Sequence, residues 1–285
     1  MAEFVCRAQA LGFTHIEANA WISPRMLREL IETRVPISSI HSPCPAKPSS
    51  TGAPVSDLSL SSLDEGERRE AVSVAKQTIE AASSVAAAAV VLHMGEAPVD
   101  RSMQGELSAL YTAGRAQTKE YSRVRDELIG RRTSLVAPFL EAAKQSLREL
   151  SEYGRERGIM LGLETRFNIR EIPDVDEMAQ LLNEAPDGPV GYWHDVGHAE
   201  VQQRLGICPH EEWLSRFKHK MIGIHLHDVR GISDHYAPGE GDVDWAMIAA
   251  HLTPRAVRVC EIGEWNDEER VRRVVGFLAK KGIAG

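Results

Sequence analysis

Residues 190–198 have the sequence Val-Gly-Tyr-Trp-His-Asp-Val-Gly-His, and the interpretation of the whole chain starts from this stretch. It begins as an apolar run and ends in Asp195, with His198 three residues further on. An aspartate at the tip of a strand and a nearby histidine bring an oxygen and an imidazole nitrogen toward one point, as a divalent cation requires. Because Asp-x-x-His pairs are common by chance, the meaning of this pair depends on the other apolar runs.

Six further short apolar segments are similar to this one in length. The seven predicted strands occupy residues 15–18, 36–41, 88–92, 159–163, 190–193, 221–227 and 258–260. Six of the seven carry, at or near their ends, a residue type that binds metals: His41, His93, Glu164, Asp195, His225 and Glu261. One end of the predicted sheet is therefore rich in metal-binding side chains.

Helical patterns separate these strands, at residues 2–11, 24–33, 64–82, 134–157, 175–183, 210–219, 246–251 and 267–281. The alternation indicates an α/β protein with a parallel sheet covered by helices, and seven such strands fit a (β/α)8 TIM barrel that lacks its first strand. Three explanations for the missing strand stay open: an open barrel, another element in the gap, or a sequence shortened at its start. We predict a single domain over residues 1–285, with a helical insertion at about 95–133.

In such barrels active sites lie at the carboxyl ends of the strands. Three carboxylates crowded there would repel one another, and a divalent cation removes that cost. Mixed histidine and carboxylate ligands suit Zn, Mn, Co or Fe better than Ca. We therefore expect a divalent metal cofactor, with Zn, Mn, Co or Mg as candidates, and two further histidines in the loops, His198 and His235, lie close enough in sequence to contribute.

A single histidine at a strand end is more often a hydrogen-bonded core or rim residue, and a single carboxylate there is as often a loop cap as a site residue, but six such residues at one end of one sheet favour a shared site. His227 should point to the same side as His225, where it supports the site. Glu17, at the first predicted strand, either lines the barrel opening or serves the fold. The arginines between residues 101 and 132 either receive a phosphate or form a solvated helix face. Four histidines end no apolar strand and are interpreted as surface or helix residues: His15, His210, His219 and His251.

Composition limits the class of protein. At 285 residues, 43% hydrophobic and 26% charged, the chain has an ordinary globular composition and can bury a substantial core. Its net charge of -8 gives no overall attraction to nucleic acid or to an anionic membrane. The four cysteines form no Cys-x-x-Cys pair, so we expect neither a disulfide scaffold nor a thiolate zinc site, and we expect a cytoplasmic setting. The most apolar run, residues 85–92, is too short to span a bilayer.

Taken in order, several short motifs resemble those of the xylose-isomerase-like barrel superfamily, which contains sugar and sugar-phosphate isomerases and epimerases, keto-sugar dehydratases and the endonuclease IV type of DNA repair enzyme. The resemblance runs over about residues 2–281. Its most specific pieces are Leu163-Glu164, Asp195-Val-Gly-His198, His225-Leu-His-Asp228 and Pro238-Gly-Glu-Gly-Asp-Val-Asp-Trp245, followed by Glu261.

The resemblance implies a shared metal site, with ligands at Glu164, Asp195, His225 and Glu261. It also implies that the two glutamates serve as acid and base in isomerases and epimerases. His198 matches a position that contacts substrate in the epimerases and a second metal in the repair enzymes. The endonuclease type has further metal ligands that match His41, His93 and His235, but Ser233 stands where it has an aspartate, with Asp234 one residue out of register.

Our first hypothesis is a divalent-metal-dependent sugar or sugar-phosphate isomerase or epimerase, acting by proton transfer through a metal-stabilised enediolate. Glu164 and Glu261 are the candidate proton carriers. We expect His198, His227 and Trp193 to contact a sugar or polyol, and the resemblance allows a homodimer.

The alternatives use the same site. An endonuclease IV-like zinc phosphodiesterase would act on abasic DNA, and a dehydratase would remove water from a keto-sugar. The acidic balance and the poorly basic Ser-Pro-Cys-Pro loop after His41 count against a nucleic-acid partner. A non-catalytic metal-binding barrel is a third interpretation.

Overall fold

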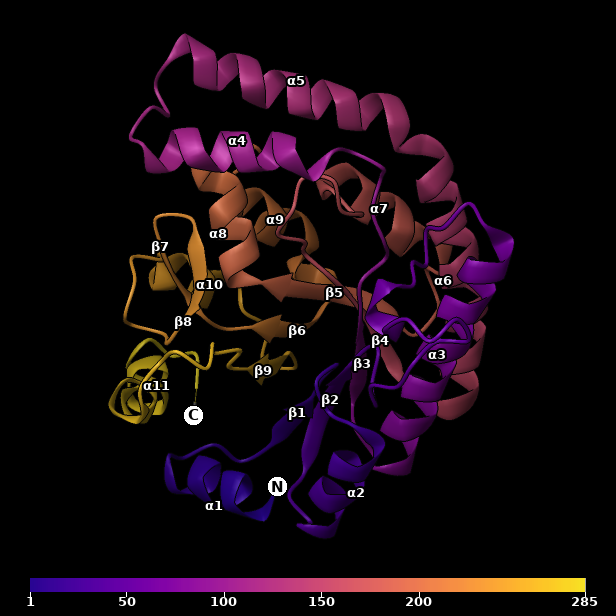
Figure 1. The fold of residues 1–285 in the computed structure, drawn as a ribbon. Coiled ribbons are helices and arrows are strands. Elements are labelled where there is room, and N and C mark those ends of the chain that lie inside the picture. The colour runs from indigo at the N-terminus through magenta and orange to yellow at the C-terminus, as the bar shows by residue number, and fades with distance from the viewer. Residues whose placement is uncertain (285) are drawn as a thin grey trace.

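A seven-stranded parallel sheet forms the centre of the molecule (Figure 1). The structure, a computed structural model, describes residues 1–284. Neighbouring strands pair in the order β1-β2-β3-β4-β5-β6-β9. Their bounds are β1 Ile16–Ala18, β2 Ile37–His41, β3 Ala89–Leu92, β4 Met160–Glu164, β5 Val190–Asp195, β6 Met221–His225 and β9 Val257–Val259. This arrangement confirms the prediction of an incomplete TIM barrel.

Helices surround the sheet, and each predicted helix is present with its ends shifted by a few residues. The helices are α1 Ala2–Ala10, α2 Pro24–Glu32, α3 Glu65–Ser84, α4 Arg101–Thr112, α5 Lys119–Leu135, α6 Ala137–Arg157, α7 Val175–Glu184, α8 Val196–Arg204, α9 His210–Phe217, α10 Trp245–His251 and α11 Glu268–Lys280. Local sequence explains several ends: Asp174 and Glu177 form a capping box at the start of α7, and Gly158 ends α6 in the left-handed conformation. Helices α4 and α5 occupy the segment for which an insertion is predicted, and they pack against each other (Figure 1).

Three elements escape the sequence patterns. Helix α8 follows Asp195 directly, and its residues 196–202 are all buried, so it lacks the one-sided apolar stripe that reveals most helices. Strands β7 Asp228–Arg230 and β8 Ser233–Tyr236 form a separate antiparallel hairpin beyond β6. The strand predicted for residues 221–227 therefore ends at His225. Two short 3-10 helices, Val55–Asp57 and Lys218–Lys220, complete the described elements.

The barrel does not close between β1 and β9, beside the position at which the missing first strand is predicted. A groove of about 1800 Å³ lies there, lined by both strands and by parts of α1 and α11. The backbone N–H of Ile16 donates to the carbonyl of Pro36, and the backbone N–H of Leu226 donates to the carbonyl of Val259. The backbone polar groups of Ile16 and Val259 therefore point toward the neighbouring strands β2 and β6. Because alternate residues face opposite sides in a ladder, the backbone groups of Glu17 and Arg258 face the groove.

The barrel interior directly beneath the strand ends is filled by Trp193, which has no exposed surface. A side chain on Gly162 or Gly223 would overlap its indole ring, so both neighbouring strands need glycine opposite it. Ala89 and Val91 complete this small apolar cluster, which is separate from the large core between the sheet and the helices. The functional side chains therefore lie directly above a closely packed part of the barrel interior.

Among residues 1–284, no helix combines the length and apolarity needed to cross a bilayer.

Candidate metal centre

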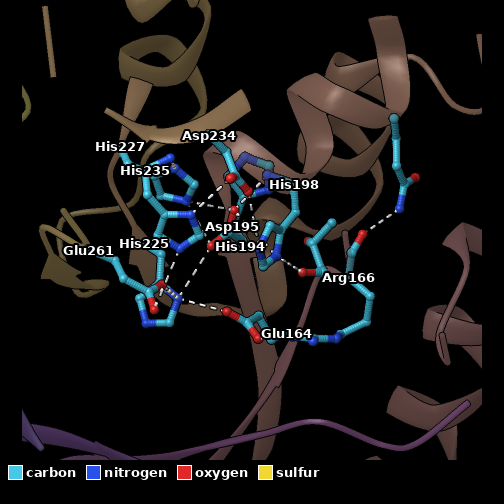
Figure 2. Close-up of polar contacts among 12 residues, drawn as sticks. Glu164, Arg166, His194, Asp195, His198, His225, His227, Asp234, His235 and Glu261 are labelled. Atoms are coloured by element: carbon cyan, nitrogen blue, oxygen red, sulfur yellow. Dashed lines mark hydrogen bonds and ion pairs between the residues drawn. The ribbon is translucent and has the colours of Figure 1, made fainter. Parts of the chain in front are cut away.

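Four strand-end side chains converge on one point at the carboxyl-end opening of the barrel (Figure 2). Glu164, Asp195 and His225 are the last residues of β4, β5 and β6, and Glu261 follows β9. The Nδ1 atom of His225 lies 2.7 Å from Glu164 Oε1, 3.0 Å from Glu261 Oε2 and 3.5 Å from Asp195 Oδ2. One ligand atom from each of the four residues lies within 4.8 Å of the others. We call these four residues the quartet.

A second group shares Glu164 with the quartet and adds two histidines predicted as ligands. His93 Nε2 lies 2.6 Å and His41 Nε2 lies 3.6 Å from Glu164 Oε2. His41 Nδ1 lies 3.0 Å from the carbonyl oxygen of Ser42. Because a carbonyl only accepts, Nδ1 carries a proton, and Nε2 is the ring nitrogen that faces Glu164 and can offer a lone pair to a cation.

A third group contains His198, Asp234 and His235. His198 Nε2 lies 3.7 Å from one Asp234 oxygen, and His235 Nδ1 lies 3.1 Å from the other. His198 Nδ1 donates to the carbonyl of Thr165 over 2.9 Å, which leaves Nε2 free to bind a cation. Ser233 occupies the sequence position of the expected aspartate, but it is the neighbouring Asp234 whose carboxylate lies near His198 and His235 in space.

The backbone explains how Asp234 enters the group. His235 has a φ of 58°, in the left-handed region, within strand β8. Such a residue interrupts the alternation of side chains along a strand. Asp234 and its neighbour His235 therefore direct their side chains to the same group, which regular strand geometry would forbid.

The charges of the quartet are unusual for buried groups. Burial opposes ionisation of Glu164, yet Arg166 and His93 hold the pKa of its carboxyl well below the ordinary value. Burial likewise opposes ionisation of Asp195, and His198 and His227 hold its pKa well below the ordinary value. Both carboxylates are therefore ionised at neutral pH.

Protonated histidines balance these carboxylates when no cation does. Burial would lower the pKa of His225, but Glu261 and Glu17 raise it well above the ordinary value. Burial also opposes the charge on His235, but Asp234 and Glu261 raise its pKa to about 10. A divalent cation supplies the same compensation, so cations and protons compete for these nitrogens. The donor set of histidine nitrogens and carboxylate oxygens fits a divalent transition metal at each of the three groups.

Arg166 is a member of the site that the sequence patterns missed. It lies two residues after Glu164, and its guanidinium contacts both that carboxylate and, at 3.0 Å, Glu171. Its side chain is 8% exposed, so it is a fixed positive charge inside the opening. The sequence does contain a signal for Arg166, because a residue two positions after a strand-end glutamate points to the same side as that glutamate when the chain stays extended.

Two residues predicted to contact substrate do not reach the opening. Trp193 is fully buried beneath His225, with ring centroids 5.3 Å apart, so it supports the site from below. His227 is also fully buried. Its Nδ1 accepts from the backbone N–H of His235 at 2.9 Å, so its Nε2 carries the proton and donates to Asp195 over 3.0 Å. Neither side chain has exposed surface, so this structure gives a substrate no direct access to either.

The glycine-containing motif at residues 238–245 has a structural purpose. Asp228 is fully buried, and its carboxylate accepts hydrogen bonds from the backbone of Gly239 and Val243 and from the Trp245 indole, at 2.8, 3.1 and 3.1 Å. A side chain on Gly241 would overlap Asp228 and the carbonyl of Val229. The motif therefore wraps around Asp228 and fixes the chain that follows His227.

A buried polar chain lies beside the site. His210, interpreted from sequence as a surface or helix residue, begins α9 but has no exposed surface. Its Nδ1 donates to Glu200 over 2.9 Å, and its Nε2 lies 3.0 Å from Nε2 of His194. Nδ1 of His194 in turn lies 2.6 Å from the Tyr192 hydroxyl, which contacts Thr165 at 2.7 Å. This chain anchors Thr165, whose carbonyl orients His198.

Comparison with known proteins places these observations in context. Residues 5–281 match the model of a family described as xylose isomerase-like TIM barrel. The uncharacterized protein MJ1311 of Methanocaldococcus jannaschii is 25% identical over 246 residues, which cover 83% of this chain and 68% of that protein.

Solved structures share the fold at low sequence identity. D-psicose 3-epimerase with D-tagatose from Clostridium cellulolyticum has a TM-score of 0.67 at 14% identity, covering 100% of this chain and 94% of that one. The TTHB071 protein from Thermus thermophilus, soaked with ZnCl2, has a TM-score of 0.58 at 20% identity, covering 98% and 91%. At these identities the likeness concerns the fold alone.

Proposed function

The chain belongs to the xylose isomerase-like TIM barrel family, and from that membership we propose that it is a divalent-metal-dependent sugar or sugar-phosphate isomerase or epimerase. The observation that carries the proposal is the convergence of two glutamates on one imidazole nitrogen. Glu164 Oε1 and Glu261 Oε2 lie 2.7 and 3.0 Å from His225 Nδ1, with Asp195 beside them. Support also comes from the epimerases among proteins of the same fold.

A divalent cation held by the quartet would polarise a substrate carbonyl and stabilise the negative charge that develops on its oxygen. The two glutamates differ in access: the Glu164 side chain is 1% exposed and that of Glu261 is 33% exposed. A sugar entering from solvent therefore meets Glu261 first, and its ionised carboxylate accepts the proton from the carbon next to the carbonyl.

Isomerisation and epimerisation differ in where the proton returns. In isomerisation Glu261 returns it to the neighbouring carbon, while the proton of the neighbouring hydroxyl moves to the former carbonyl oxygen. In epimerisation the two glutamates act on opposite faces of one carbon, one accepting and the other donating the proton. Arg166 keeps Glu164 oriented beside the reacting centre through its contact with the carboxylate.

The test is deuterium exchange from solvent into keto-hexoses, keto-pentoses and their phosphates, with protein whose metal content is measured by elemental analysis. Glu261→Gln should abolish exchange while far-UV circular dichroism stays unchanged. Glu264→Gln, an exposed glutamate in the same loop, is the matched control and should exchange at the wild-type rate. Full exchange by Glu261→Gln would remove Glu261 from this role.

One observation favours a second candidate, zinc-dependent hydrolysis of a phosphodiester at abasic DNA. Asp234 completes a third ligand group beside the quartet and the group of His41 and His93. Two or three Zn per chain, together with salt-sensitive nicking of an abasic duplex, would support this candidate. About one metal per chain and no nicking would favour the sugar enzyme.

A further inference from the structure

His225 is held from both sides of its ring. Its Nδ1 faces the quartet, and its Nε2 lies 3.0 Å from Oε1 of Glu17, the middle residue of β1. Neither side chain is accessible: His225 has no exposed surface, and the Glu17 side chain is 7% exposed. This contact joins the edge strand β1 to β6 across the barrel interior.

Glu17 is itself fixed by a neighbour. The pairing of β1 with β2 sets Glu17 opposite Ser39. The Ser39 hydroxyl, also fully buried, donates to Glu17 Oε2 over 2.5 Å. One carboxylate oxygen thus receives a hydrogen bond from Ser39 while the other faces His225, so the carboxylate has a single orientation.

The chemistry of the contact decides the tautomer of His225. A carboxylate only accepts hydrogen bonds, so Nε2 must carry a proton when it faces Glu17. The nitrogen that can offer a lone pair is then Nδ1, which is the one among the quartet carboxylates. Without Glu17, nothing on the Nε2 side favours the tautomer that leaves the Nδ1 lone pair for a cation.

We propose that Glu17, held by Ser39, is a positioning residue that fixes the tautomer of His225 and so sets the affinity of the quartet for a divalent cation. This inference rests on the proposed metal dependence. Carboxylates that hydrogen-bond to a metal-binding histidine orient the ring and strengthen it as a ligand, and their removal weakens metal binding by roughly 10–100-fold.

The same contact has a simpler alternative, which is to tie the edge strand to the barrel. The two roles differ in what a substitution changes. A purely structural contact affects the melting temperature and leaves metal affinity alone. A positioning contact changes affinity and the protonated nitrogen of His225 even where the fold is stable.

The experiment measures Zn²⁺ and Mn²⁺ affinity of the full chain by competition with a chromophoric chelator, for wild type, Glu17→Gln, Ser39→Ala and Glu32→Gln. Gln retains the size of Glu17 and removes its charge. Glu32 is exposed on α2 and provides the matched control. We expect a loss of roughly 10–100-fold for Glu17→Gln, a smaller loss for Ser39→Ala and none for Glu32→Gln.

Long-range ¹H–¹⁵N spectra supply a second measurement, with the His225 signals assigned from their loss in His225→Gln. We expect a proton on Nε2 in the metal-loaded wild type, with Nδ1 shifted by Zn²⁺, and a mixture of tautomers in Glu17→Gln. If the wild type binds metal, equal metal affinities of wild type and Glu17→Gln together with an unchanged His225 tautomer would overturn only the positioning role of Glu17. A wild-type chain that takes up no cation overturns both this inference and the proposed function.

Discussion

Asp234 contributes the single carboxylate of the group that includes His198 and His235. Substituting Asp234→Asn keeps the volume but removes the charge that a cation between two histidines needs. We expect bound metal to fall by about one cation per chain in preparations that fill all three groups, because the groups around Glu164 stay intact. Elemental analysis after gel filtration measures this. Ser233→Ala, one residue away and exposed, should keep the full content, and an unchanged content in Asp234→Asn would exclude Asp234 as a ligand.

At the scale of single residues, the sequence predicts side chains at strand ends better than those in loops. His41, Glu164 and Asp195 converge because parallel strands end at one edge, and that follows from strand order alone. The role of Asp234 escapes prediction because its direction depends on the left-handed backbone of His235. The position of Trp193 is equally hidden, because the glycines that make room for it lie on other strands.

At the scale of elements, the segment after β6 is organised around the buried carboxylate of Asp228. Gly241→Ala would push a methyl group into Asp228 and the backbone at Val229. We expect a loss of about 1–3 kcal/mol in the free energy of unfolding, measured by urea denaturation. Gly105→Ala in α4 meets no atom within 4 Å and is the control, with a gain of about 0.5–1 kcal/mol. Equal stability in wild type and Gly241→Ala would show that this loop has room to move.

The elements that the sequence does not predict share a physical cause. In helix α8 residues 196–202 are all buried, polar ones such as Glu200 and Gln202 included, so burial creates no helical period in the sequence. Hairpin β7–β8 is short and polar, and the backbone N–H of His235 ties it to His227 outside the hairpin. The seven barrel strands and the amphipathic helices carry their periodicity in the sequence itself, which is why they are predictable.

At the scale of the whole molecule, acid stability should depend on the pair of Arg166 and Glu171. Burial opposes ionisation of Glu171, but Arg166 and His93 lower its pKa from 4.5 to about 2. A folded-state pKa below the unfolded value gives stability that is present above pH 4.5 and is lost as the pH falls toward 2. The shift corresponds to about 3 kcal/mol at neutral pH.

Glu171→Gln should therefore be less stable than wild type at pH 7, and the difference should shrink between pH 4.5 and 2. Chemical denaturation across this range measures the effect. Glu106→Gln, on the exposed side of α4, should follow the wild-type curve. A constant difference between Glu171→Gln and wild type at all pH values would show that the carboxylate charge is not the cause.

The sequence predicts the overall architecture but not what occupies the space between the edge strands β1 and β9. Strand count and alternation predict an incomplete barrel, and the pairing of the strands confirms it. Sequence patterns alone give no preference among the explanations for the missing strand, because hydrophobic periodicity describes the elements present. The groove between β1 and β9 is a property of the assembled sheet.

The indole of Trp193 gives the protein an internal optical probe. The centroid of its ring lies 5.3 Å from that of His225, and the indole has no exposed surface. A protonated imidazole quenches tryptophan emission, whereas an imidazole bound to Zn²⁺ has lost that mobile proton. The Trp193 component of the emission should therefore rise as the quartet fills, against a background from the other four tryptophans, and occupancy of the site can be followed in real time without a substrate or a dye.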